Sequence, residues 1–141
     1  MTNTTTTTLR GSCLCGAVRY EAVGELRRFL HCHCSRCRKA TGTGHASNLF
    51  MQPGTLQVFS GNQNIRSFKL PEAQRFTNSF CAICGSRLPR QASGSDVVMI
   101  PAGSLDDEPA LQPQARIFEG SRAPWSCAGD DLPVHDQYPP P

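Results

Sequence analysis

A chain of 141 residues is long enough for one domain with a core, and its mean hydropathy of −0.35 is typical of a soluble globular protein. No apolar run approaches the ~20 residues that a membrane-spanning helix needs, which argues against a membrane protein. The formal net charge is +3, but residues 1–90 carry 12 basic and 3 acidic side chains, whereas residues 91–141 carry 2 and 8. The basic half suits a small anionic ligand and lacks the dense basic stripe of a nucleic-acid-binding protein.

Both ends of the chain have the composition of tails. The first ten residues, MTNTTTTTLR, lack the apolar core of a secretory signal, so we expect a disordered segment over 1–10 in a cytoplasmic protein. The Pro-rich end YPPP predicts a second tail over 136–141, which leaves one domain over 11–135. In the reducing cytoplasm, eight cysteines are expected to be metal ligands instead of disulfides.

Short segments of β-type composition follow one another along the chain, separated by turn residues. Strands are expected at 17–22, 46–51, 55–60, 64–70, 75–80 and 96–100. Pro53-Gly54 separates two of them, and Gly61-Asn62 is expected to turn a hairpin. The pattern predicts a mainly β, single-domain fold of antiparallel strands.

One short helix is expected within the strand pattern. Ser35 can act as the N-cap of the segment RCRKAT, and Gly42 can end the helix. Cys37 would then lie in the first turn, where the helix dipole and free backbone N–H groups favour a thiolate.

Seven of the eight cysteines fall in three short motifs. They are Cys13 and Cys15 in GSCLCG, Cys32, Cys34 and Cys37 in HCHCSRC, and Cys81 and Cys84 in FCAICG. Alternate residues of an extended chain point to the same side, so each C-x-C motif directs two sulfurs at one ion. The turn of C-x-x-C-G does the same, with a glycine that tolerates positive φ.

The seven thiols can be grouped in two ways. A zinc ribbon would pair Cys34 and Cys37 with the FCAICG cysteines, but 43 residues separate Cys37 from Cys81, against a usual gap of ~15–20. The other grouping joins the GSCLCG and FCAICG pairs into a closed four-thiolate site and leaves an open triad. We favour the second because it keeps the same-face pair Cys32 and Cys34 on one ion, although spacing alone is only moderately specific.

Five stretches in this order carry a family resemblance: GSCLCGAVRYEA, HCHCSRCRKATGTGHASNLF, FCAICGSRL, GSLDDEP and SRAPWSCAGDDLP. Over roughly residues 11–135 the chain resembles the glutathione-dependent formaldehyde-activating enzyme family, which includes centromere protein V-type members. The resemblance implies coiled antiparallel β-sheets and carbon–sulfur lyase activity like that of an S-(hydroxymethyl)glutathione synthase. It also implies one zinc on Cys13, Cys15, Cys81 and Cys84 and a second on Cys32, Cys34 and Cys37.

The two clusters are expected to play different roles. Four thiolates saturate a tetrahedral zinc, so the first site should be structural. Three thiolates leave one position open, where a substrate thiol would lose its proton and add to a small aldehyde. Water, substrate, His45 or Cys127 could fill that position, whereas His31 and His33 should point away from the triad in a regular strand.

Several side chains near the triad are candidates for substrate contacts. Arg36, Arg38 and Lys39 lie on or beside the expected helix and could attract the carboxylates of a glutathione-like thiol, although a solvated helix face fits them equally well. Trp125 could lie against a ligand or could hold the C-terminal loop.

An enzyme is the favoured interpretation: a zinc-dependent carbon–sulfur lyase or thiol–aldehyde adduct enzyme that acts on a small thiol such as glutathione and an aldehyde such as formaldehyde. The alternative is a non-catalytic zinc-binding module for a protein or nucleic acid partner, as in centromere protein V-type relatives. A nucleic acid partner is disfavoured because the N-terminal arm is Thr-rich with a single arginine.

Overall fold

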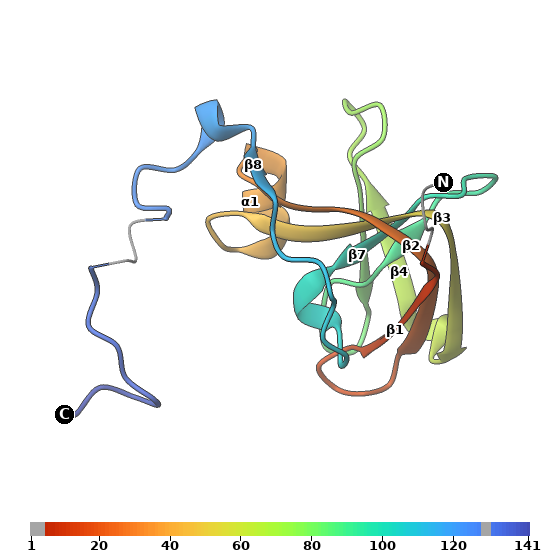
Figure 1. Ribbon diagram of the computed structural model, residues 1–141, viewed down its shortest axis with the longest axis horizontal. Helices are drawn as coiled ribbons and strands as arrows, with labels where there is room; N and C mark the ends of the chain where they lie inside the picture. The colour runs from red at the N-terminus through yellow and green to blue at the C-terminus, as the bar shows by residue number, and fades with distance from the viewer. Residues whose placement is uncertain (1–4, 128–130) are drawn as a thin grey trace.

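Strands dominate the computed structural model, which describes residues 5–127 and 131–141. The main sheet has six strands in the order β1-β2-β3-β7-β6, with β8 also paired to β2, and a second sheet pairs β4 with β5 (Figure 1). The strands are β1 (Thr7–Ser12), β2 (Arg19–Cys32), β3 (Ala46–Ser60), β4 (Ile65–Lys69), β5 (Thr77–Cys81), β6 (Arg90–Gln91), β7 (Val98–Pro101) and β8 (Ala115–Ile117). All pairs are antiparallel except β2 with β8. The predicted mainly β, antiparallel fold is confirmed.

Helical structure is limited to short segments. The helix α1 spans Ser35–Thr41, and three single 3₁₀ turns cover Asn62–Asn64 (η1), Ala102–Ser104 (η2) and Glu119–Ser121 (η3). In Figure 1, α1 and β8 lie together at one end of the main sheet. Within residues 5–127 and 131–141, no helix has the length and apolar character to cross a membrane.

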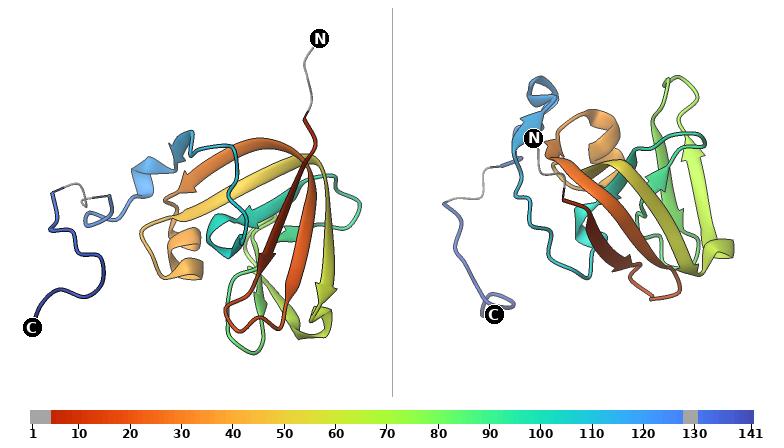
Figure 2. Two further views of the ribbon diagram at one scale, coloured as in Figure 1. Left: turned by 60° about the horizontal axis from the view of Figure 1, so that its bottom comes forward. Right: turned by 45° about the vertical axis from the view of Figure 1, so that its right-hand side comes forward.

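The strands β2 and β3 are long and bend together, so that the sheet coils around the core (Figure 2). The register between them shifts at Gly24/Leu26 and again at Leu26/Arg28. At the bend, a Cβ on Gly24 would lie 2.2 Å from the carbonyl oxygen of Pro53, so only glycine permits this approach. The predicted strands 46–51 and 55–60 are therefore a single strand, because Pro53-Gly54 forms the bend and does not end the pairing.

The first strand, β1, was not predicted from the sequence. Residues 7–10, expected within a disordered segment over 1–10, pair with β2 from Thr7 opposite Gly24 onward. Leu9 is 2% exposed and packs in the main core, so this apolar residue holds the Thr-rich segment against the sheet.

The expected hairpin at Gly61-Asn62 is wrong. Gly61 adopts a left-handed φ of 77° and leads into η1, which carries the chain from the main sheet to the second sheet. The strand that follows, β4, pairs with β5 and not with β3. The second sheet therefore contacts the main sheet without strand pairing, in part through the cysteines described below.

The main core lies within the bend of the large sheet. Its buried members are Leu9, Tyr20, Ala22, Phe29, Leu49, Met51, Val98 and Ile100. The Tyr20 hydroxyl lies 2.7 Å from the Ser104 hydroxyl, which pairs its polar end, and burial raises the pKa of this tyrosine to about 12. The core thus joins β1, β2, β3 and β7 and fixes the β2 and β3 ends that carry the site.

Leu49→Ala is expected to lower the free energy of unfolding by about 2–5 kcal/mol, because Leu49 is fully buried at the centre of this core. Urea denaturation followed by circular dichroism measures the change. Leu132→Ala removes the same atoms from a side chain that is 63% exposed and should change stability by less than about 0.5 kcal/mol. Equal effects of the two changes would contradict the assignment of the core.

Candidate metal centres and the adjoining cavity

The first cluster contains four thiols from two distant parts of the chain. Cys13 and Cys15 lie in the loop after β1, Cys81 ends β5, and Cys84 lies in the turn that follows. Their Sγ atoms are all within 4.8 Å of one another, with 3.6 Å between Cys13 and Cys15 and 3.9 Å between Cys15 and Cys81. Zn–S bonds of about 2.3 Å place tetrahedral thiolates about 3.8 Å apart, so the four sulfurs fit a zinc-sized ion. The fold therefore brings together the same four cysteines that the favoured grouping of the sequence analysis joined.

Backbone geometry prepares this first cluster. Gly85 has a φ of 77°, and its N–H donates to the Cys81 carbonyl at 2.7 Å, which closes the C-x-x-C-G turn. The Val18 N–H donates to the Cys13 sulfur at 3.3 Å. The Ser86 hydroxyl and backbone N–H lower the pKa of Cys84 to about 5, which favours the thiolate that a metal needs.

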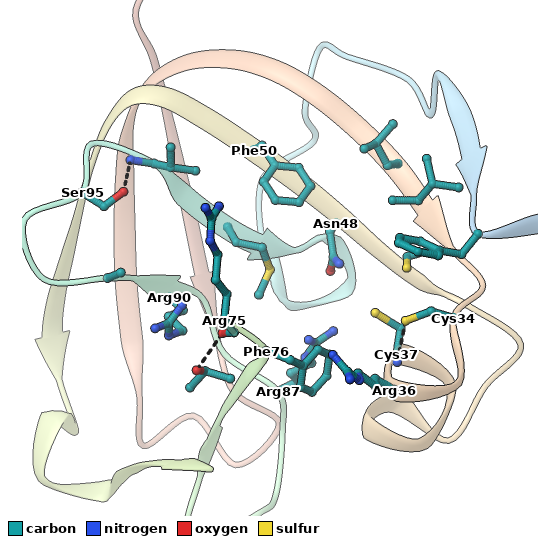
Figure 3. A pocket seen from close by; sticks show the side chains of 18 residues that line it. Cys34, Arg36, Cys37, Asn48, Phe50, Arg75, Phe76, Arg87, Arg90 and Ser95 are labelled. Atoms are coloured by element: carbon teal, nitrogen blue, oxygen red, sulfur yellow. Dashed lines mark hydrogen bonds between the residues drawn. The ribbon is translucent and has the colours of Figure 1, made fainter. Parts of the chain in front are cut away.

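The triad forms where β2 passes into α1. Cys32 ends β2, Cys34 precedes the helix and Cys37 lies in its first turn, and their Sγ atoms are within 4.8 Å of one another. Figure 3 shows Cys34 and Cys37 facing a cavity. Burial raises the pKa of Cys37. At Cys34 burial acts in the same direction, but the Cys37 N–H and the neighbouring thiols lower the pKa overall.

The N-cap of α1 is Cys34 and not Ser35 as predicted. Cys34 is extended, with φ −65° and ψ 156°, and its sulfur accepts the Cys37 N–H at 3.3 Å, so the thiol occupies the capping position. Gly42 ends the helix as expected, with a φ of 72° and its N–H donated to the Arg38 carbonyl.

The histidines form a separate group. His31 and His45 stack with ring centroids 4.1 Å apart, and His33 lies 5.0 Å from His45. The Cys127 sulfur is 3.9 Å from His33 Nε2. Neither His45 nor Cys127 belongs to the close group of triad sulfurs, so the structure places both candidates for a fourth ligand with the other histidines instead.

A cavity of about 500 Å³ opens beside the triad. One part of its wall is apolar, formed by Leu30, Phe50, Phe76, Val97, Met99, Ile117 and Phe118. The polar part contains Arg36, Asn48, Arg75, Arg87 and Arg90, which Figure 3 shows around the cavity. Cavities of this size and character are typical of small-molecule sites.

Only one of the four candidates for substrate contact lines this cavity, and it is Arg36. Arg38 and Lys39 are not among its lining residues, since they lie on other faces of α1. Trp125 is 65% exposed, and its ring lies 3.4 Å from where a Cβ on Gly44 would sit, so it packs against the loop after α1. Asn48 and three arginines were missed because they come from β3, from the segment before β5 and from the chain around β6, so that only the fold brings them to the triad.

Arg87 lines the cavity together with the triad. Its Nε donates to Asn78 Oδ1 at 2.9 Å, whereas its buried Nη1 has no hydrogen-bond partner among the described residues. Burial lowers the pKa of Arg87, and the charges of Cys37, Cys32 and Cys34 oppose that shift. The guanidinium is therefore held where it acts on the charge of the three thiols.

A coiled antiparallel sheet with one closed four-thiol cluster and one three-thiol cluster on a cavity defines a β protein with two candidate metal centres of different kinds. The family model of the glutathione-dependent formaldehyde-activating enzyme matches residues 8–121. The chain belongs to this family.

Two individual proteins are similar to this chain, one in sequence and one in fold. A putative glutathione-dependent formaldehyde-activating enzyme of Halomonas elongata is 40% identical over 86 residues, which cover 57% of this chain and 54% of that protein. The chain thus spans about half the length of that curated relative. The crystal structure of a Rhodobacter sphaeroides protein has the same fold, with a TM-score of 0.52, 24% identity, and coverage of 77% of this chain and 98% of that one.

Proposed function

We propose that this protein is a zinc-dependent carbon–sulfur lyase that joins a small thiol such as glutathione to a small aldehyde such as formaldehyde and cleaves the adduct. One observation carries the proposal: the triad Cys32, Cys34 and Cys37 lies on the wall of a cavity of small-molecule size. The family and the Halomonas elongata relative point to the same two substrates by their names. A cytoplasmic location suits eight free thiols.

The donor sets fit zinc in two different ways. Cys13, Cys15, Cys81 and Cys84 would saturate a structural ion, whereas Cys32, Cys34 and Cys37 would hold a second ion by three bonds. Zinc held by Cys32, Cys34 and Cys37 would supply a Lewis acid, which would make a substrate thiol more acidic than it is in water.

The protein groups around the triad favour the addition reaction. Arg36 and Arg87 bring positive charge to the triad side of the cavity, and the apolar wall formed by residues such as Phe50 and Ile117 limits water. The thiolate sulfur attacks the aldehyde carbon to form the C–S bond, and the C=O electron pair moves to oxygen, which takes a proton. Cleavage of the hydroxymethyl thioether runs through the same steps in reverse.

Adduct exchange provides the test of this function. With ¹³C-formaldehyde and glutathione, NMR exchange spectroscopy should show the zinc-loaded protein accelerating adduct formation and breakdown on the order of 100-fold over buffer, the usual contribution of a positioned catalytic group. Cys127→Ser serves as a matched cysteine control, because Cys127 lies outside both clusters, and should retain the full rate.

The alternative is a non-catalytic zinc-binding module for a protein or nucleic acid partner. It would be favoured by a zinc-loaded protein that leaves the exchange rate at the buffer value. Loss of the rate in Cys127→Ser would instead contradict the assignment of the reaction to the triad, because Cys127 lies outside it.

A further inference from the structure

The cavity beside the triad has an unbalanced charge. Four of its lining side chains are arginines, namely Arg36, Arg75, Arg87 and Arg90, and no Asp or Glu lines it in the part of the chain that the structure describes. Among the described residues, the arginines that form ion pairs are Arg10, Arg27 and Arg122. The four cavity arginines therefore have no carboxylate within 4.0 Å that would neutralise them. Three thiolates on one divalent ion add a single negative charge, which leaves the cavity strongly positive.

Two buried polar atoms on the cavity wall lack hydrogen-bond partners among the described residues. They are Nη1 of Arg87 and Oδ1 of Asn48, and the Asn48 residue is only 8% exposed. Asn48 projects from β3 toward the cavity, and Arg87 lies across from it beside the triad (Figure 3). A buried donor or acceptor without a partner costs about 1–3 kcal/mol, so such atoms are typical of a site that a polar ligand completes.

The positive charge of the cavity matches a ligand that carries a carboxylate near the reacting sulfur. A guanidinium offers paired N–H donors that match the two oxygens of a carboxylate, so the unpartnered Nη1 of Arg87 suits such a group. The unpartnered Oδ1 of Asn48 is an acceptor and suits a hydrogen-bond donor of the ligand. Because Nε of Arg87 already donates to Asn78, the Nη groups are the donors that remain for a ligand.

We propose that this cavity selects thiols that carry a carboxylate and no ammonium group, with Arg87 binding the carboxylate. The inference rests on the proposed function and names the substrate class of the same site. A free amine finds no acidic partner on the cavity wall and meets four guanidinium groups. Glutathione carries both carboxylates and an ammonium, so only its carboxylates are matched here, and a simple mercapto acid fits the site better.

Three thiols of similar length and different terminal charge test this selection. They are 3-mercaptopropionate, which is anionic, 2-mercaptoethanol, which is neutral, and cysteamine, which is cationic. Isothermal titration of the zinc-loaded protein gives their affinities. The Co²⁺-substituted protein reports entry of sulfur at the triad through its thiolate charge-transfer absorption. The expected order is 3-mercaptopropionate tightest and cysteamine weakest, with about 10–100-fold between the first two, as for one charge-assisted hydrogen-bonding group.

Variants locate the selectivity. Arg87→Met should bring the affinity for 3-mercaptopropionate close to that of 2-mercaptoethanol, and Asn48→Asp should weaken the mercapto acid selectively by charge repulsion. Arg19→Met is the matched control, since it removes one exposed arginine that does not line the cavity and should leave the order unchanged. If Arg87→Met does not fold, the affinities of the three thiols for the wild-type protein still test the selectivity.

The outcomes separate the inference from the function. Equal affinities of the three thiols, each with the charge-transfer band, would overturn the selectivity and leave the thiol site intact. Tighter binding of cysteamine than of 3-mercaptopropionate would have the same meaning. Absence of the band with every thiol would overturn the proposed function itself, and the selectivity with it.

Discussion

Cys84→Ser is expected to yield protein that is largely insoluble or that melts well below the wild type. Cys84 belongs to the closed cluster, which ties the loop after β1 to the turn after β5 and so joins the two sheets. The apolar core beside this cluster is small: among the described residues, Val18 and Leu88 are its buried members besides two of the ligands. Binding of a structural zinc by four thiolates is worth about 10–16 kcal/mol in small zinc domains, comparable with the whole stability of a typical protein.

Thermal melting with zinc determination on the soluble fraction measures this effect. A loss of several kcal/mol corresponds to a fall in Tm of more than about 10 °C for a chain of this length. Cys127→Ser is the control, because it makes the same chemical change at a thiol outside the cluster and should leave Tm nearly unchanged. A soluble Cys84→Ser protein that melts with the wild type would show that this cluster does not hold the fold.

Cys34→Ala is expected to abolish adduct exchange while the fold is retained. The zinc content should fall from about two ions per chain to one, since two remaining thiols hold the second ion weakly. The substitution also removes the sulfur that caps α1, which costs about 0.5–2 kcal/mol. That loss is small enough for the sheets and the closed cluster to persist.

Metal analysis, circular dichroism and ¹³C exchange spectroscopy together distinguish the two roles of Cys34. Ser35→Ala is the matched control at the neighbouring exposed position and should keep two zinc ions and full activity. If the Cys34→Ala protein unfolds, the triad is a structural site that the fold requires. Full activity in that variant would refute the proposed role of the triad in the reaction.

The cysteine motifs allowed prediction of the two clusters because metal ligation imposes short spacings and fixed directions on neighbouring side chains. The strand alternation that separates Cys32 from His31 and His33 is likewise a local rule, and the histidines do lie together with His45, apart from the triad. Local patterns also identified the helix and its end at Gly42.

The remaining features depend on contacts between distant segments. The continuity of β3 through Pro53 results from its approach to Gly24 on another strand, so a turn signal read from the sequence alone is misleading there. The strand at Thr7 depends on the burial of Leu9 against the sheet. Arg87 follows the closed-cluster cysteines in sequence and yet lines the cavity of the triad, a placement that depends on how the chain segments pack.

The anchoring of the triad has a consequence for metal exchange. Cys32 is fixed by pairing with Ala46 on one side and Ile117 on the other, and Cys34 and Cys37 are linked by the capping hydrogen bond of α1. These contacts are made by the polypeptide itself, so they would hold the three sulfurs together without an ion. Under the proposed function, departure and return of an ion at the triad would then require no refolding, whereas loss of an ion from the closed cluster would remove a link between the two sheets. We therefore expect zinc supply to change the activity at the triad with little effect on stability.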